Sequence, residues 1–371
     1  MRNALWREAL AFCVVCSWGW GATRAGAGDA SHWLISRDLL DHAKLTLVWQ
    51  QQLSVRQGET IELMELLDDR LYLRSERNYT WSLDWQSGTV IFNRSIAPAG
   101  FPILGWEPYE DRILSVIDNE VVELDRDTGT QQRVSDLELS IVAPPVRNGR
   151  FFYVSAADRR VHALRARDMV DLFEVSARNE SLINTVLADE DMVVFGTDAG
   201  NLIAILADAP RKLWQFDAVE GISGPVIRDG RSLYFASRDT NVYRVDMGDA
   251  GTVSLAWKYQ AEALLDRAPR VTANAAYQYA LGRGLFAIDK QSGRTLWSLP
   301  EGLDLLADAG GRAYVITRHN TLVVMNNATG RKLCWVNFAP VAYHAANVVD
   351  GKIYIAGADG RVACLEPGAT D

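Results

Sequence analysis

Histidine and cysteine are the side chains that most often hold metals or act as nucleophiles, and this 371-residue chain has few of either. Its five histidines are His32, His42, His162, His319 and His344. None of them forms a close pair such as H-x-x-x-H, so their spacing gives no basis for a zinc site. The sequence contains neither the G-x-S-x-G elbow of hydrolases nor a phosphate-binding P-loop. We therefore predict no catalytic, cofactor-binding or metal-binding residues.

The four cysteines form two separate pairs along the sequence. Cys13 and Cys16 lie in an apolar N-terminal segment, whereas Cys334 and Cys364 lie 30 residues apart near the C-terminus. If the chain is exported, a disulfide between Cys334 and Cys364 is permitted. Cysteine also serves as a small buried hydrophobic residue. We favour two free, buried thiols.

Five aspartates recur at one position of a repeated hairpin, and a ring of carboxylates could bind a cation. They are Asp118, Asp158, Asp198, Asp239 and Asp359. Three other residues hold this position in the remaining copies, namely Arg77, Arg283 and His319. Asp is a favoured turn residue, and adjacent turns around a ring are too far apart for several carboxylates to meet on one metal. We therefore interpret the aspartates as turn residues.

A basic cluster stands out against an acidic chain. Arg159, Arg160, Arg165 and Arg167 lie close together, whereas the formal net charge of the chain is −9. Removing residues 1–27, which carry +2, leaves a net charge of −11. Nucleic-acid binding needs a basic footprint, so we exclude nucleic acid, and also an anionic membrane surface, as partners. We interpret the arginine cluster as solvated surface, with a site for an acidic partner as the alternative.

The elements that must position any site repeat along the chain. Residues 282–299, GRGLFAIDKQSGRTLWSL, predict two short strands joined by a turn over 289–293. The Asp289 carboxylate can bond backbone N–H groups of the turn, and Gly293 can adopt positive φ at its end. Trp297 gives the second strand a bulky apolar anchor. The unit is typical of a β-hairpin.

The same unit recurs with steps of 37 to 43 residues. Counterparts of Asp289 are Asp84, Asp125, Arg165, Leu206, Asp246, Asn326 and Leu365. A glycine follows four residues later at Gly88, Gly129, Gly293 and Gly330. A large side chain follows eight residues later at Phe92, Phe173, Trp214 and Trp297, and Arg133 is the exception. Each of five copies also has a tyrosine in an earlier strand, at Tyr72, Tyr153, Tyr234, Tyr314 and Tyr354.

Two further tryptophans fit this spacing if small insertions are allowed. Trp257 needs an insertion of three residues and Trp335 an insertion of one. We therefore expect Trp214, Trp257, Trp297 and Trp335 to pack between neighbouring units, because burial of an indole removes a large apolar area from water.

Eight copies are present, at 61–96, 112–134, 143–175, 185–216, 224–259, 269–299, 303–338 and 344–366. A repeat of about 40 residues with only β-type segments is typical of propeller blades. The last copy lacks its final strand, and an unmatched strand with Trp49 lies at 45–53. We predict an all-β, eight-bladed β-propeller of four-stranded antiparallel blades. The N-terminal strand would complete the last blade and remove its open edge.

The segment LFAIDKQSGRTLW resembles the pyrroloquinoline-quinone-type (PQQ-like) repeat β-propeller family, and the resemblance covers residues 45–366. This family includes the outer-membrane assembly lipoprotein BamB and the quinoprotein alcohol dehydrogenases. The dehydrogenases have adjacent cysteines over the quinone and a calcium held by carboxylates. This chain has no adjacent cysteines and no match to the calcium or catalytic positions. The resemblance therefore implies a BamB-like propeller without a cofactor.

The expected domain organisation has three parts: a signal peptide at 1–27, an arm at 28–44 and the propeller at 45–371. Arg2 and Arg7 precede 14 apolar residues at 9–22, and a small-x-small site follows at 25–27. An apolar stretch of this length is short of the ~20 residues that span a bilayer, although an uncleaved anchor is the alternative. A lipoprotein is disfavoured because no small residue precedes Cys13 or Cys16. In the arm, Ser36 could cap one or two helical turns.

We predict a non-catalytic, monomeric scaffold of the periplasm or cell envelope that binds a protein partner through loops on a propeller face. The irregular segment 97–111 carries Phe101, Trp106 and Tyr109, which either pack over the barrel or serve as interface anchors. The alternatives are a quinone- or metal-dependent oxidoreductase and a propeller that binds carbohydrate or another small ligand in its central channel.

Overall fold

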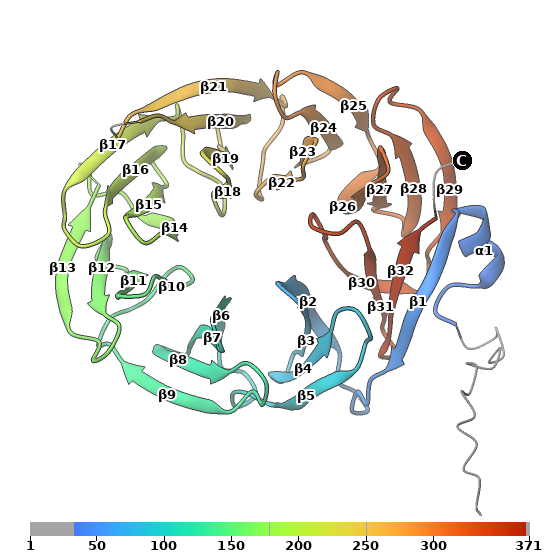
Figure 1. The fold of residues 1–371 in the computed structure, drawn as a ribbon, viewed down its shortest axis with the longest axis horizontal. Helices are drawn as coiled ribbons and strands as arrows, with labels where there is room; N and C mark the ends of the chain where they lie inside the picture. Colours follow the sequence, from blue (N-terminus) through green and yellow to red (C-terminus); the bar gives the residue numbers. More distant parts are fainter. Residues whose placement is uncertain (1–32, 178, 250, 369–371) are drawn as a thin grey trace, which may run out of the picture.

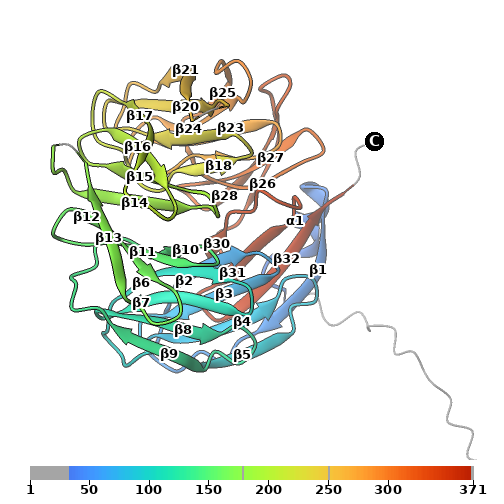
Figure 2. The same cartoon turned by 60° about the vertical axis from the view of Figure 1, so that its left-hand side comes forward.

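The computed structural model describes residues 33–177, 179–249 and 251–368. Within them, 32 strands and one helix form a ring of eight four-stranded sheets around a central axis (Figure 1). The strands of each sheet are antiparallel, and the first strand of each blade lies nearest the axis. Figure 2 shows that the blades follow one another around the ring in chain order. The predicted fold is confirmed.

The first four blades have these bounds. Blade 1 contains β2 (Ile61–Leu67), β3 (Arg70–Ser75), β4 (Tyr79–Asp84) and β5 (Val90–Ser95). Blade 2 contains β6 (Ile103–Tyr109), β7 (Arg112–Ile117), β8 (Glu120–Asp125) and β9 (Gln131–Asp136). Blade 3 contains β10 (Val146–Arg147), β11 (Phe151–Ser155), β12 (Arg160–Arg165) and β13 (Asp171–Ser176). Blade 4 contains β14 (Ile183–Ala188), β15 (Met192–Thr197), β16 (Asn201–Leu206) and β17 (Lys212–Asp217).

The remaining blades complete the ring. Blade 5 contains β18 (Ile227–Asp229), β19 (Ser232–Ala236), β20 (Asn241–Met247) and β21 (Val253–Gln260). Blade 6 contains β22 (Arg270–Val271), β23 (Ala275–Ala280), β24 (Gly284–Asp289) and β25 (Thr295–Leu299). Blade 7 contains β26 (Gly302–Ala309), β27 (Arg312–Thr317), β28 (Thr321–Asn326) and β29 (Lys332–Asn337). Blade 8 contains β30 (Val341–Ala345), β31 (Ile353–Gly357), β32 (Arg361–Pro367) and, as its outer strand, β1 (Leu45–Gln52).

The N-terminal strand closes the ring, as the sequence predicted. β1 pairs antiparallel with β32, so that Trp49 lies opposite Cys364 (Figure 1). The pairing gives β32 a hydrogen-bonded neighbour on its outer side. Without β1, β32 would be an exposed edge strand.

Neighbouring blades are joined by one side chain on the outer strand of each blade. This side chain lies eight or more residues after the start of the turn between the third and fourth strands. Trp257 of blade 5 is buried, and its Nε1–H donates to the carbonyl oxygen of Lys290 in blade 6 at 3.0 Å. Arg133 of blade 2 occupies the same strand position and donates through Nη1 to the carbonyl oxygen of Ala166 in blade 3 at 2.5 Å. The two acceptors, Lys290 and Ala166, are equivalent, because each directly follows the first turn residue of its blade, Asp289 or Arg165. Arg133 therefore replaces the indole N–H and keeps the contact between blades.

The turn glycine of the next blade makes room for this side chain. Gly293 has a φ of +70°, and a Cβ added to it would lie 2.6 Å from Cγ of Trp257. Gly88 has a φ of +71°, and an added Cβ would lie 2.5 Å from the ring of Trp49. Glycine is required for two reasons, because the turn needs positive φ and the aromatic ring lies directly on the backbone.

Trp335 contradicts the predicted packing. Cys334 lies opposite Val324 at the position that Trp297 holds opposite Ala287 in blade 6. Adjacent residues of a strand point to opposite faces, so Trp335 faces away from this interface and is 68% exposed. The insertion allowed for Trp335 was wrong, since the ordinary spacing of eight residues from Asn326 leads to Cys334. Trp214, Trp257 and Trp297 are buried as expected.

The segment 97–111 also differs from its prediction as an irregular loop. It contains β6, the innermost strand of blade 2, and Trp106 on this strand is buried against Tyr72 with ring centroids 5.7 Å apart. A role for Trp106 as an exposed interface anchor is therefore wrong. Gly105 has a φ of +72°, and the pairing register shifts between Leu104 and Glu107. This β-bulge explains why the segment does not alternate like an ordinary strand.

The expected signal peptide at 1–27 lies outside the described residues, and the three-part domain division stays a prediction. In the expected arm, α1 spans Arg37–His42 after Ser36, whose side chain makes no capping hydrogen bond. Leu40 of α1 is buried in the cluster that blades 7 and 8 form. Within the described part of the chain, no helix is long and apolar enough to cross a bilayer.

We predict that Gly293→Ala destabilises the propeller more than Gly311→Ala does. Gly311 has a φ of +72° and nothing within 4 Å of an added Cβ, so both variants carry the same backbone strain and only Gly293→Ala meets Trp257. Overpacking of this kind costs about 1–3 kcal/mol. Urea denaturation of both variants measures the difference, and equal losses of unfolding free energy would contradict the account.

Candidate functional site

One end of the ring carries both the hairpins between second and third strands and the links between blades; we call this end the connector face. In blades 1 to 7, the link that enters the blade is hydrogen-bonded to the hairpin of that blade. The backbone N–H of Asp198 donates to the carbonyl oxygen of Leu182 at 2.9 Å, and that of Leu281 donates to Leu264 at 3.0 Å. Links and hairpins therefore form one continuous loop surface.

Large apolar side chains are exposed on this surface in consecutive blades; we call them the apolar arc. Five lie in the links after blades 1 to 5 and the sixth in the hairpin of blade 6. They are Phe101, Val142, Leu182, Val219, Leu264 and Leu281, with exposed fractions from 37% to 77%. Of the three aromatics predicted as packed or as anchors, Phe101 is exposed and Trp106 is buried. Tyr109 is half-buried, and its ring lies 4.0 Å from the guanidinium carbon of Arg147.

The repeated aspartates lie in the hairpins of the connector face, and three of them hold their own turns. Asp158, Asp239 and Asp359 each accept a hydrogen bond from the backbone N–H two residues ahead, at 3.0 to 3.1 Å. Their second oxygens have partners as well: for Asp239 the hydroxyl of Tyr243 at 2.5 Å, and for Asp359 the guanidinium of Arg361 at 2.7 Å. This geometry favours the turn interpretation over a shared cation site.

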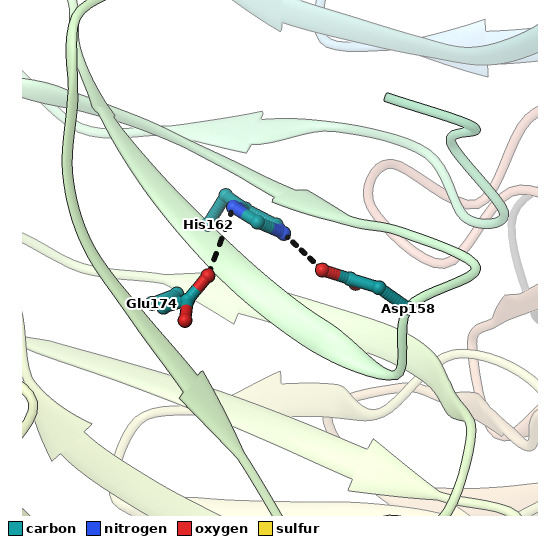
Figure 3. A group of neighbouring side chains, drawn as sticks. All are labelled: Asp158, His162 and Glu174. Atoms are coloured by element: carbon teal, nitrogen blue, oxygen red, sulfur yellow. Dashed lines mark hydrogen bonds and ion pairs between the residues drawn. The ribbon is translucent and has the colours of Figure 1, made fainter. Parts of the chain in front are cut away.

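One of these aspartates belongs to a group that the sequence did not reveal, here called the His162 cluster. Figure 3 shows three of its members, Asp158, His162 and Glu174, and Asp171 is the fourth. His162 lies on β12, and Asp171 and Glu174 lie on the neighbouring β13. The Nε2 of His162 is 2.9 Å from Asp158 Oδ2, whereas Nδ1 is 2.7 Å from Asp171 Oδ2 and 3.9 Å from Glu174 Oε2. The spacing between histidines in the sequence does not reveal a cluster of one histidine and three carboxylates formed across two strands.

The His162 ring is only 4% exposed and lies between the carboxylates of Asp158 and Asp171. Burial lowers the pKa of His162, but hydrogen bonds to Asp171 and Asp158 outweigh burial, so the pKa is raised. Ionised carboxylates can only accept hydrogen bonds, so a carboxylate at each ring nitrogen favours the doubly protonated, positively charged imidazole. One ligand atom each of Asp158, His162 and Glu174 lies within 4.8 Å of the others, but a metal would have to replace a ring proton. The cluster is therefore best described as an ion-paired histidine.

The basic cluster of the sequence is largely neutralised by neighbours. Arg160 pairs with Glu174, and Arg165 and Arg167 both pair with Asp168 at 2.8 and 3.4 Å. Arg159 donates to the carbonyl oxygen of Glu180 at 3.3 Å. These contacts favour the solvated-surface interpretation over a site for an acidic partner.

The other histidines do not converge with His162. His344 lies 3.4 Å from Asp304 on the innermost strands of blades 8 and 7, His319 is exposed in the hairpin of blade 7, and His42 lies in the last turn of α1. The fifth, His32, lies outside the described residues.

Sequence comparison agrees with this architecture. A family described as outer membrane protein assembly factor BamB matches residues 99–215 and 206–307, which together span more than half of the chain. The chain belongs to this family. No curated protein matches the sequence.

Two solved structures share the fold of this BamB-family propeller. BamB from Moraxella catarrhalis has 18% sequence identity and a TM-score of 0.64, covering 87% of this chain and 97% of its own. The computationally designed Ika8 protein has 14% identity and a TM-score of 0.62, covering 84% of this chain and 98% of its own. At these identities the likeness concerns the fold.

Cys334 and Cys364, the two cysteines within the described residues of this BamB-family chain, are free, as predicted, and lie in different blades. Cys364 is buried opposite Trp49, and burial raises the pKa of its thiol to about 12. Cys334 is half-buried, which corrects the expectation that both thiols are fully buried. Burial also raises the pKa of the Cys334 thiol, so neither thiol is activated as a nucleophile at neutral pH.

We predict that His162→Gln destabilises the protein more at about pH 5.5 than at about pH 9. A raised folded-state pKa contributes stability that is fully present below the unfolded pKa and is lost as the pH rises through the folded value. Loss of the charged hydrogen bonds costs about 1–3 kcal/mol at the lower pH. Urea denaturation at both pH values measures this, with the exposed His319→Gln as the matched control. A pH-independent loss would contradict the charged state of His162.

Proposed function

We propose that this propeller is a non-catalytic scaffold of the cell envelope that binds a protein partner through its connector face. Membership of the family described as outer membrane protein assembly factor BamB supports an envelope role. The basic and apolar N-terminal residues, together with the small-x-small site at 25–27, support export.

The apolar arc is the observation that carries the proposal. Six exposed large apolar side chains follow one another over six blades on one end of the ring, whereas the described loops of the opposite end carry three, Val170, Val348 and Val349. Soluble proteins seldom keep such a series exposed unless it forms an interaction surface. Because the links are held to the hairpins by backbone hydrogen bonds, the arc offers a partner a preformed surface.

The chemistry of the described side chains supports a binding role over catalysis. A catalytic site needs a nucleophile or base whose pKa suits the reaction, placed beside groups that stabilise developing charge. The buried Cys364 thiol has a pKa of about 12, and both ring nitrogens of His162 are already hydrogen-bonded to carboxylates. Neither group is poised to act as a nucleophile or a base at neutral pH.

We predict that the double variant Val219→Glu with Leu264→Glu loses partner binding. Val219 is 77% and Leu264 48% exposed, so two carboxylates should disrupt an apolar interface by more than about 2 kcal/mol and leave the fold intact. The matched control is Val348→Glu with Val349→Glu, at 40% and 77% exposure on the opposite end.

Crosslinking pull-downs from native envelopes measure both variants, with thermal unfolding to verify the fold. The proposal expects the wild type and the control to capture the same partner and the connector-face variant to capture none. Equal capture by both variants, or loss only in the control, would overturn the proposed surface.

A further inference from the structure

An exposed tryptophan lines a pocket on the outer rim between blades 6 and 7. Trp335 on β29 is 68% exposed, whereas tryptophans at the regular interface position, such as Trp297, are buried. Since Trp335 faces away from the interface that Cys334 occupies, its indole contributes little to joining blades 7 and 8. The indole is therefore free to contact a ligand.

The cavity beside this indole, here called the Trp335 pocket, has a volume of about 330 Å³. Its apolar wall is formed by Trp335 and by Val323, which lies directly opposite on β28. Its polar edge is formed by Thr321 and His319 from the β27–β28 hairpin region and by Glu301 from the link between blades. The volume lies in the range of pockets that hold small ligands.

The charged groups of the Trp335 pocket neutralise one another. The ammonium of Lys332 bonds the Glu301 carboxylate, and this hydrogen bond is the main reason that the pKa of Glu301 is lowered. A phosphate or carboxylate ligand would have to compete with Glu301 for Lys332, and a cationic ligand would have to compete with Lys332 for Glu301. The pair can still donate and accept further hydrogen bonds, so the pocket fits an uncharged ligand with hydroxyl groups.

We propose that the Trp335 pocket binds a sugar unit of an uncharged glycan. The C–H face of a sugar ring is apolar and slightly positive, so it can lie flat on the negative face of an indole. The hydroxyl groups at the edge of the same ring can bond Glu301, Lys332 and Thr321. The pocket adjoins the connector face, because Glu301 lies in a link and His319 in a hairpin of that face, but it differs from the apolar arc in ligand class. The proposal does not depend on a protein partner.

The surroundings of Trp335 favour a sugar over a protein. A tryptophan that anchors a protein interface is normally enclosed by a rim of contacts that exclude water. Here the neighbours of the indole, apart from Val323, are hydroxyl, imidazole and charged groups in a concave pocket. Stable protein interfaces also bury about 800 Å² on each partner, far more than a single small cavity provides.

The test uses three uncharged probes, namely maltotetraose, cellotetraose and the tetramer of N-acetylglucosamine. Saturation-transfer NMR and calorimetry would measure their binding to wild type, to Trp335→Ala and to Leu255→Ala, a 46% exposed leucine on the outer strand β21. The proposal expects wild type and Leu255→Ala to bind at least one probe with a Kd of about 1 mM or tighter. Trp335→Ala should bind that probe at least about tenfold more weakly.

Three results would overturn the proposal. The first is that wild type binds none of the probes at about 10 mM. The second is that Trp335→Ala, with its fold verified by thermal unfolding, binds as tightly as wild type. The third is that Trp335→Ala loses a protein partner in envelope pull-downs while wild type binds no sugar, which would assign the pocket to a protein.

Discussion

The ring depends on one recurring contact, in which a side chain of one blade lies on the glycine turn of the next. Trp49 lies on Gly88, Phe92 on Gly129, Trp257 on Gly293 and Trp297 on Gly330. The contact buries a large apolar area. Replacing one such buried aromatic side chain with alanine typically lowers the free energy of unfolding by about 3–5 kcal/mol. In the Trp49 and Trp257 interfaces the contact also satisfies a carbonyl oxygen through the indole N–H. The closing blade uses the same contact, since Trp49 comes from the N-terminal strand.

This constraint separates the residues that fold the ring from those that remain for function. The facing sides of the blades are filled by the anchors and by the central tyrosines, which are nearly inaccessible to solvent. Function is therefore left to the two ends and to the outer strands. On the connector face the links carry the apolar arc, and on the outer rim the displaced Trp335 lines a pocket. Both features lie where a change of residue leaves the contacts between blades intact.

The sequence predicted most of the fold because the first turn residue and the large side chain are eight residues apart within one local hairpin. Blade number, the closing strand and the buried Trp214 and Trp297 follow from that spacing, and the buried Trp257 follows if three residues are inserted. Prediction failed at two places. An unnecessary insertion assigned the anchor to Trp335 instead of Cys334. In β6, Gly105 and the bulge conceal a strand and with it the burial of Trp106.

The sites were less predictable than the fold, for a physical reason. The His162 cluster joins a hairpin residue to side chains of two strands, and such a contact depends on the cross-strand register rather than on sequence spacing. The apolar arc likewise consists of single residues about 40 positions apart, such as Val142, Leu182 and Val219. These residues share one end of the ring because every blade has four antiparallel strands, so that the chain leaves each blade at the end where it entered.

Photocrosslinking in the native envelope tests most directly whether the connector face is the binding surface. A photoreactive benzophenone side chain would replace Leu264 in one variant and Val349, on the opposite end, in another. The account predicts covalent adducts with a protein from position 264 and none from position 349. Adducts from position 349 alone, or none from either position in cells that contain the folded protein, would contradict it.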